Sequence, residues 1–329
     1  MNKKLLSFVR LINLLFSRFA PKLTQKKSSL LTFTFHGLFR NENERTLNLV
    51  DPRPWITIDD FRSFVEYYLN HDYLFISPDD ILNCLKDDKK YISITFDDGY
   101  YNNQYILPLL NEYKIPAIFF ISTNHVKHNK CFWWDVLYRE GLKNGMSLDK
   151  ISYIKKQLKK QTTEKSENYL KGLFGEGIFK PLSDIDRPFT LLELKNFSKD
   201  KLVFLGNHTS NHDILTNHSS TEIKSFILHA QDFLYDITGI YPKTISYPNG
   251  NCSNEIIRIS KEIGLKLGFT VEFKKTRLPI DCSIDDCMRM GRFDFYGYEE
   301  RNELIKQCEI FQSDVTLSNW IIWILSKSM

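Results

Sequence analysis

The sequence predicts an α/β fold in which a mostly parallel sheet curls into a closed or nearly closed barrel. Apolar runs of strand length alternate with helical apolar patterns along most of the chain, which is typical of parallel sheets with crossover helices. The runs at 91–96 and 117–121 are almost continuously apolar, as expected for strands covered on both faces. We therefore expect one barrel domain over 29–295, interrupted by a helical insertion at about 129–188.

The individual elements follow from periodicity and from the residues that start and end helices. Strands are expected at 30–35, 73–76, 91–96, 117–121, 202–205, 245–247 and 267–271. Helices are expected at 57–70, 78–85, 102–113, 221–238 and 254–263, and a further helix opens at Thr190. Thr57 and Asp60 have the spacing of a capping box, and Gly264 marks the end of the last helix.

The stretch at 129–188 breaks this alternation and is rich in lysine. Such lysines could line a groove for an acidic glycan or a lipid phosphate. The commoner alternative is the solvated face of inserted helices. After the barrel, residues 296–329 are expected to form a C-terminal helical extension.

Composition excludes some classes of protein and bears on the compartment. The 329 residues carry 44 Lys and Arg against 40 Asp and Glu, and this net charge of +4 is spread over the chain, unlike the focused basic field of a nucleic-acid-binding protein. The six cysteines form no CxxC pair, which favours free thiols in a reducing compartment. We therefore expect a cytoplasmic protein without a nucleic-acid partner.

Residues 1–28 are expected to form an amphipathic helix. Apolar residues recur there at helical spacing, Arg10 and Arg18 interrupt the apolar run, and no small-residue cleavage site follows. Packing of this helix on the domain is the favoured interpretation, and peripheral contact with the inner membrane face is the alternative. The apolar run at 320–325 is too short to span a bilayer.

Two adjacent carboxylates, Asp97 and Asp98, follow the strand expected at 91–96 and precede Gly99. Paired carboxylates at the carboxyl end of a buried strand are costly without a counter-charge, and that end of a barrel is its catalytic face. With a metal ion as the counter-charge, one carboxylate can bind it while the other stays free as a base. A surface turn is the alternative for the tripeptide alone.

A pair of histidines, His208 and His212, follows the strand expected at 202–205. Imidazoles four residues apart share one face of a helical turn and could bind one metal ion, although this spacing alone is a weak signal. Together with one Asp they make a three-ligand site with an open position for water. Such a site suits Zn²⁺ or another borderline divalent ion such as Co²⁺ or Ni²⁺.

The segment SYPNG at 246–250 ends a third strand. A backbone N–H near Tyr247 could help to hold an oxyanion there. Taken alone, the segment is more often a simple turn.

These pieces together resemble a known family. The segments ISITFDDGYYNN, PAIFFIST, CFWWDVL, GNHTSNHDIL and ISYPNG are similar, in this order and at similar separations, to those of the polysaccharide deacetylases, carbohydrate esterase family 4 with the NodB homology domain. The resemblance covers roughly residues 30–292. It implies a NodB-like deformed (β/α) barrel of about seven strands and metal-dependent removal of an acyl group from an N-acylated sugar.

The resemblance also implies roles for the candidate site residues. Asp97 corresponds to the catalytic base of the family. Asp98, His208 and His212 correspond to its metal ligands, and Tyr247 to a contributor to its oxyanion site.

The chain departs from the family pattern in two places. The late Leu-x-His motif that carries the acid histidine in many members is absent, but the start of the chain is similar to the exopolysaccharide and lipopolysaccharide biosynthesis branch, which implies that His36 in TFHG is the general acid. A structural role is the alternative for this lone histidine. The Arg that usually precedes SYPNG is also absent, and Arg292 in MGRFDF is similar to an Arg found late in this branch, which implies that it orients Asp97.

Aromatic residues near these motifs are candidates for stacking on sugar rings, with core packing as the alternative for the tryptophans. The full set of substrate-binding candidates is Tyr100, Trp133, Trp134, Pro248 and Asn249. The expected activity is removal of an N-acetyl group from an amino sugar in a polysaccharide or glycan precursor, that is, hydrolysis of a linear amide C–N bond. The alternatives are a deformylase of a lipid-linked N-acyl sugar and a catalytically silent glycan-binding relative, and the intact ligand set argues against the latter.

Overall fold

The computed structural model describes residues 28–280, 285–295 and 301–312. The N-terminal helix expected over 1–28 falls almost entirely outside these residues. Of the expected extension over 296–329, only helix α13 (Arg301–Gln312) lies within them. None of the helices in the described part of the chain is both long and apolar enough to cross a membrane.

One large sheet organises the described residues. Its strands are β1 (Ser29–Phe35), β4 (Tyr73–Phe75), β5 (Lys90–Phe96), β6 (Ala117–Ile121), β7 (Val203–Asn207), β8 (Thr244–Ser246), β9 (Leu267–Phe269), β10 (Thr276–Arg277) and β11 (Phe293–Asp294). Seven of them follow the path β10-β1-β5-β6-β7-β8-β9, while β4 pairs with β5 and β11 pairs with β1. Only the β1–β10 pair is antiparallel. The predicted parallel sheet is confirmed, with two short strands beyond the seven expected.

The segment 290–295 connects the two edges of this sheet. Met290 donates its N–H to the carbonyl of Gly268 in β9 at 2.9 Å, and three residues later Phe293 pairs with Phe33 in β1. The sheet therefore curls into the deformed barrel that the sequence predicts. Arg292 lies at the point where the two edges meet.

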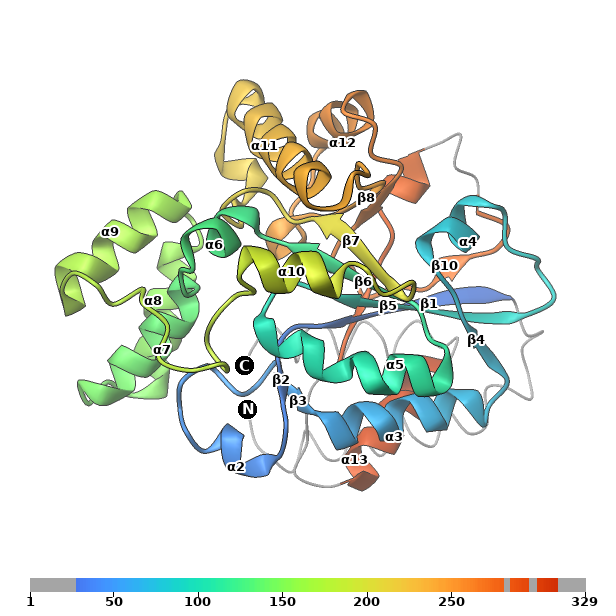
Figure 1. Cartoon of the computed structure of the whole chain (residues 1–329), viewed down its shortest axis with the longest axis horizontal. Coiled ribbons are helices and arrows are strands. Elements are labelled where there is room, and N and C mark those ends of the chain that lie inside the picture. The colour runs from blue at the N-terminus through green and yellow to red at the C-terminus, as the bar shows by residue number, and fades with distance from the viewer. Residues whose placement is uncertain (1–27, 281–284, 296–300, 313–329) are drawn as a thin grey trace.

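Helices surround this sheet (Figure 1). Those of the barrel are α3 (Ile58–Leu69), α4 (Pro78–Leu82), α5 (Leu107–Tyr113), α6 (Thr123–His128), α10 (Leu191–Phe197), α11 (Ser220–Thr238) and α12 (Asn254–Glu262). Three further helices, α7 (Trp133–Lys143), α8 (Leu148–Leu158) and α9 (Thr163–Phe174), lie within the range expected for the insertion and gather at one end of the molecule. A short helix α2 (Glu42–Arg45) and a two-stranded sheet of β2 (Leu38–Phe39) and β3 (Ile56–Thr57) complete the fold.

The core beneath β1 and β5 is aromatic. Phe33 and Phe35 meet Phe64 of α3 edge to face, at ring-centroid distances of 4.8 and 5.3 Å. Phe96 of β5 stacks on Phe119 of β6 at 4.9 Å. Such pairs contribute about 0.5–1.5 kcal/mol each beyond the burial of their surface. Strand β5, which ends at the candidate carboxylates, and its neighbour β1 therefore rest on a tightly packed base.

Helix boundaries differ from the expected ones where a special residue intervenes. The capping box of Thr57 and Asp60 is present at the start of α3. The helix expected over 102–113 instead begins with a 3₁₀ segment, Tyr101–Ile106, before α5. Pro108 explains the difference, because it has no N–H and its ring would clash with the carbonyl four residues earlier in a continuous α-helix.

The cysteines depart in part from the expectation of six free thiols. Cys84, Cys131, Cys252 and Cys308 are free. Cys287 is disulfide-bonded, so the expectation is wrong for this residue. The cytoplasmic location inferred from the thiols stays a prediction.

Candidate active site

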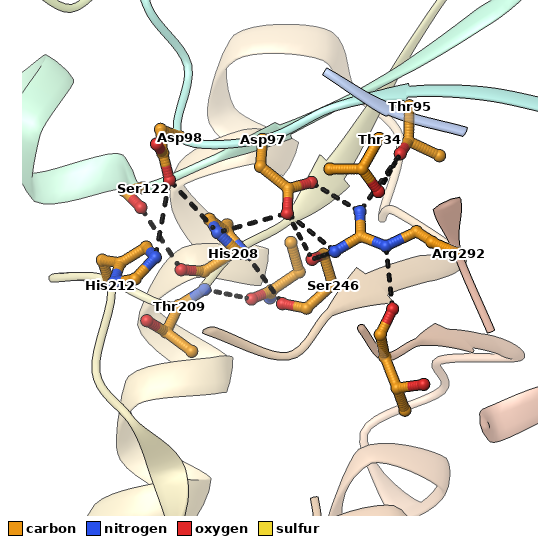
Figure 2. Close-up of polar contacts among 12 residues, drawn as sticks. Thr34, Thr95, Asp97, Asp98, Ser122, His208, Thr209, His212, Ser246 and Arg292 are labelled. Atoms are coloured by element: carbon orange, nitrogen blue, oxygen red, sulfur yellow. Dashed lines mark hydrogen bonds and ion pairs between the residues drawn. The ribbon is translucent and has the colours of Figure 1, made fainter. Parts of the chain in front are cut away.

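The candidate residues from three separate motifs converge at one end of the barrel. Asp97 and Asp98 follow β5, His208 follows β7, and Ser246 is the last residue of β8. The carboxyl ends of parallel strands meet at the same edge of a barrel, and Figure 2 shows the side chains pointing toward one another there.

A strained turn sends the two adjacent carboxylates in different directions. The backbone N–H of Asp97 donates to the carbonyl of Phe35 at 2.9 Å, which fixes the backbone of Asp97. Asp98 and Gly99 then take φ angles of +78° and +88°, in the left-handed region that side chains rarely adopt. As a result Asp97 faces Arg292 whereas Asp98 faces the two histidines.

Arg292 binds Asp97 in a buried bidentate pair. Its Nη1 and Nη2 donate to the two carboxylate oxygens at 2.7 and 2.8 Å. The other three N–H groups donate to Thr95 Oγ1, Ser246 Oγ and the carbonyl of Thr270, at 3.1, 2.9 and 3.0 Å. All five guanidinium donors are therefore satisfied, which holds Arg292 and hence Asp97 in one orientation.

The electrostatics keep Asp97 ionised. Burial raises the pKa of Asp97, but the positive charges of Arg292 and His208 outweigh burial and bring the pKa well below its usual value. The hydroxyl of Ser246 also donates to Asp97 Oδ2 at 3.0 Å. A carboxylate so held is an acceptor at every physiological pH.

Asp98, His208 and His212 form a metal-binding constellation. Their ligand atoms all lie within 4.8 Å of one another, and Asp98 Oδ1 is 3.4 Å from His208 Nε2 and 3.5 Å from His212 Nε2. Asp98 Oδ1 and His208 Nε2 are buried and lack a hydrogen-bond partner. Buried polar atoms are rarely left unpaired, so these residues fit a bound divalent cation.

The protonation of the two histidines supports this conclusion. His208 Nδ1 donates to the carbonyl of Ser246 at 2.8 Å, which directs Nε2 toward Asp98. Burial lowers the pKa of His212 to about 3, so this ring is neutral and can act as a ligand. Burial also lowers the pKa of His208, but Asp97 and Asp98 outweigh it and raise the pKa. The same two carboxylates would stabilise a metal ion at this place.

The expectation that the two histidines share a helical turn is wrong. Residues 208–212 form a non-helical turn in which Thr209 and His212 have φ angles of +61° and +55°. Side chains take over the role of the helical hydrogen bonds: Asn207 Oδ1 accepts the N–H of Thr209 at 2.9 Å, and Thr209 Oγ1 accepts that of Asp213 at 2.8 Å. The imidazoles still meet, with ring centroids 4.8 Å apart.

His36 lies at the same end of the barrel. It directly follows Phe35, the last residue of β1, which pairs with Phe96 just before the carboxylates. His36 is half-buried, and its charge is among the smaller influences that lower the pKa of Asp97 and Asp98 against the dominant effect of burial. The backbone of His36 thus lies at the active end of the barrel, and its role as the acid stays a prediction.

Tyr247 does not supply an oxyanion donor. Its N–H donates to the carbonyl of Phe269 at 3.0 Å, as part of the pairing next to β8 and β9. Its side chain is fully buried in an apolar cluster that includes Ile245, Ile256 and Met288. Strand pairing thus uses the N–H of Tyr247 itself and the core covers its ring, while an oxyanion donor from a neighbouring backbone N–H stays a prediction.

The aromatic candidates for sugar binding divide between core and site. Tyr100 is 1% exposed and its hydroxyl donates to Asp135 at 2.6 Å, so a sugar ring cannot reach it and the expectation is wrong. Trp133 is 4% exposed and packs in the core of the insertion. Trp134 is partly exposed, and its ring centroid lies 4.5 Å from that of His212.

A pocket lies between the insertion and the metal-binding constellation. It is lined by Trp133, Trp134, Leu158, Lys159, Gln161, Thr163, Ser166, His212, Ile214 and Asn249. Asn249, predicted to bind substrate, thus lies on the pocket wall and accepts a hydrogen bond from Lys159 Nζ at 2.6 Å. Pro248 is buried and does not line this pocket.

The sequence reasoning did not single out Ser246 and Asp135. The hydroxyl of Ser246 joins Asp97 to Arg292, and its carbonyl orients His208. The signal available in the sequence for Ser246 was a small hydroxyl residue at the end of a strand, directly before the tyrosine of SYPNG. Asp135 follows two tryptophans in an otherwise apolar helix start, and a charged residue there is a signal for a buried partner.

Fold and site together define a (β/α) barrel with a candidate metal site of two histidines and one carboxylate beside a buried carboxylate–guanidinium pair. A family model described as "Polysaccharide deacetylase" matches residues 85–172 and 192–268, together half of the chain. The chain belongs to the polysaccharide deacetylase family, as its sequence motifs predict.

Individual relatives agree with this assignment. The poly-beta-1,6-N-acetyl-D-glucosamine N-deacetylase of Staphylococcus aureus is 30% identical over 220 residues, which are 65% of this chain and 60% of the relative. The chain thus spans about 60% of the length of the curated relatives it matches.

Solved structures share the fold. The deacetylase PplD of Streptococcus pyogenes, in complex with acetate, has a TM-score of 0.56 at 17% identity, covering 86% of this chain and 99% of that one. IcaB from Ammonifex degensii has a TM-score of 0.57 at 15% identity, covering 87% and 97%. At these identities the likeness concerns the fold.

Proposed function

We propose that the protein is a metal-dependent hydrolase that removes an N-acetyl group from an amino sugar of a polysaccharide or glycan precursor. The observation that carries the proposal is the pairing of two unlike carboxylates. Asp97 is ionised and accepts three side-chain hydrogen bonds, from Arg292 and Ser246, while Asp98 has an unpaired oxygen facing two histidines. One carboxylate is thus equipped as a base and the other as a ligand. A glycan-binding relative without activity would have no use for this division.

Asp98, His208 and His212 would hold the metal ion, and this donor set favours Zn²⁺, with Co²⁺ or Ni²⁺ as alternatives. When bound, the ion polarises a carbonyl oxygen and lowers the pKa of a bound water.

The residues of the chain supply the proton transfers. Asp97 accepts a proton from the attacking water while the oxygen of that water bonds to the acyl carbon. Arg292 and Ser246 hold the carboxylate of Asp97 in place. The C–N bond then breaks, and His36 donates a proton to the departing nitrogen. The products are acetate and a free amino sugar.

The family and its relatives support a glycan substrate. The Staphylococcus aureus relatives are named for poly-beta-1,6-N-acetyl-D-glucosamine, so we propose an N-acetylated polysaccharide as the first substrate to test. The pocket is lined by Trp134, Asn249 and the proposed metal ligand His212, so we expect the sugar chain to contact the protein beside it. A lipid-linked N-acyl sugar is the second substrate to test.

The test measures acetate and formate release together with bound metal. Wild type and Asp97→Asn are compared on N-acetylated oligosaccharides and on lipid-linked N-acyl and N-formyl sugars. We expect acetate release by wild type with about one divalent ion per chain, and loss of turnover with retained metal in Asp97→Asn. Formate release alone would identify a deformylase, and absence of both metal and product would refute the proposal.

A further inference from the structure

The two histidines of the metal site are held in different ways. His208 is oriented by the hydrogen bond from its Nδ1 to the carbonyl of Ser246, the usual arrangement for a metal-binding histidine. Within the described part of the chain, the ring of His212 has no such hydrogen bond and its charged partner is Asp98. Instead its ring packs against the indole of Trp134 in a tilted arrangement, with centroids 4.5 Å apart and an angle of 58° between the rings. Packing, rather than a hydrogen bond, therefore sets the orientation of His212.

Trp134 is itself tethered by two buried residues. Its Nε1 donates to the hydroxyl of Tyr100 at 3.1 Å, and that hydroxyl donates to Asp135 Oδ2 at 2.6 Å. An indole N–H can only donate, so the Tyr100 oxygen accepts from Trp134 and its own proton points to Asp135 Oδ2. Asp135 is the terminal acceptor, and both Asp135 and Tyr100 are 1% exposed.

This chain of contacts joins the insertion to the loop that carries the carboxylates. Asp135 and Trp134 belong to the first turn of α7, whereas Tyr100 follows Asp98 by two residues. A backbone bridge between Tyr100 and Pro188 ties the far end of the insertion to the same loop. A shift of α7 would therefore move the ring that lies against a metal ligand.

Trp134 also makes a stacked ring contact. Phe132 stacks on it with a centroid distance of 5.0 Å and an interplanar angle of 20°, and His125 of α6 stacks on Phe132 at 4.3 Å. Both of these residues are fully buried. The indole thus contacts a packed aromatic column as well as the imidazole of His212.

We propose that Asp135, Tyr100 and Trp134 are positioning residues that hold the metal ligand His212, so that the helical insertion controls the affinity of the metal site. The inference rests on the proposed metal-dependent function. It assigns Trp134 to the metal site rather than to a platform for sugar rings.

The experiment titrates the metal-free full chain with Co²⁺ and Zn²⁺ in the presence of a competing chelator, and records the visible spectrum of the Co²⁺ form. Trp134→Ala and Asp135→Leu should each weaken metal binding by about 10-fold, the lower end for groups that orient a ligand, and should shift the Co²⁺ bands. Asp135→Asn keeps an acceptor oxygen for Tyr100 and should restore affinity to within about 3-fold of wild type. Trp133→Phe is the matched control, since this neighbouring indole contacts Trp134 but not His212.

The outcomes separate this inference from the proposed function. If Asp135→Leu does not fold, as thermal melting of the metal-free protein would reveal, Trp134→Phe replaces it, because this variant keeps a ring but loses the tether to Tyr100. Wild-type metal affinity and spectrum in Trp134→Ala and Trp134→Phe, with a raised KM, would show a sugar platform and overturn the inference alone. Failure of wild type to bind either metal would overturn the proposed function and this inference together.

Discussion

The half of the site that the barrel builds differs in construction from the half that the insertion completes. On the barrel side, Asp97, Arg292 and His208 are buried and held by directional hydrogen bonds from three strands. On the insertion side, His212 and Trp134 meet through ring contact at the wall of a pocket. Hydrogen-bonded buried charges tolerate almost no displacement, whereas ring contacts change gradually with distance. The barrel half is thus suited to fixed chemistry, and the insertion half to adjustment of affinity and substrate.

The largest effect on the barrel half of the site is expected from the removal of Arg292. Arg292→Ala leaves Asp97 as an unpaired buried carboxylate, which is expected to lower the free energy of unfolding by about 3–5 kcal/mol. Arg292→Lys keeps the charge but loses the bidentate fork, so a smaller loss is expected. Chemical denaturation measures both.

The matched control is Arg258→Ala, which removes an exposed pair with Glu262. Its effect should stay below about 1 kcal/mol. Equal stability of Arg292→Ala and wild type would mean that Asp97 is neutral or hydrated in the folded protein, contrary to its lowered pKa.

The second prediction concerns the acid on the barrel side. His36→Gln should lower kcat by about 10²-fold, the lower end for a general acid, because the leaving nitrogen then departs without a positioned proton donor. Metal content should not change, since His36 is not among the ligands. Steady-state kinetics and metal analysis check this, and a rise in KM at constant kcat would instead assign His36 to substrate binding.

The barrel half could largely be predicted from the sequence, and the reason is local. Asp97 and Asp98 directly follow a continuously apolar strand, so strand geometry alone brings them to the active end of the barrel. The histidine pair follows β7 in the same way, although the turn between the two was expected to be helical and is not.

Contacts that depend on distant segments could not be derived from the residues alone. Arg292 lies 195 positions from Asp97, and only resemblance to a family suggested the pairing. Tyr100 was expected at the sugar and Asp135 carried no expectation, because the packing of α7 on the loop after β5 leaves no periodic signal in the sequence.

The third prediction concerns the pH dependence of stability that Asp135, the buried acid of the insertion half, produces. Burial raises the pKa of Asp135 to about 8, with Asp98 and Asp51 adding to this effect and Tyr100 and Lys155 opposing it. Its unfolded pKa is about 3.9, so between about pH 4 and 8 the folded chain holds a proton that the unfolded chain has released. Stability contributed by this group therefore falls as pH rises, by at most about 1.4 kcal/mol per pH unit.

Asp135→Asn removes this titration. The unfolding free energy of the variant relative to wild type should increase from pH 5 to pH 8, as measured by denaturant titration of the metal-free proteins. A difference that does not change with pH would show that Asp135 is ionised in the folded chain.

The smallest effect is expected where the insertion touches the barrel only at the surface. Lys159 donates to Asn249 across the pocket, and Asn217 donates to the carbonyls of Lys159 and Gln161. These bonds are exposed, so Lys159→Met should change the unfolding free energy by no more than about 0.5 kcal/mol. Because Lys159 lines the pocket, KM should rise a few-fold while kcat is kept.

Lys160→Met is the matched control, since Lys160 bonds only within its own turn, to Gln157, and does not line the pocket. It should leave both constants unchanged. A large fall in kcat for Lys159→Met would mean that the insertion takes part in the chemistry itself, and the division between a fixed barrel half and an adjustable insertion half would then be wrong. A selective change in KM would show that evolution can retune the substrate through the insertion while the buried carboxylate, guanidinium and histidine of the barrel stay as they are.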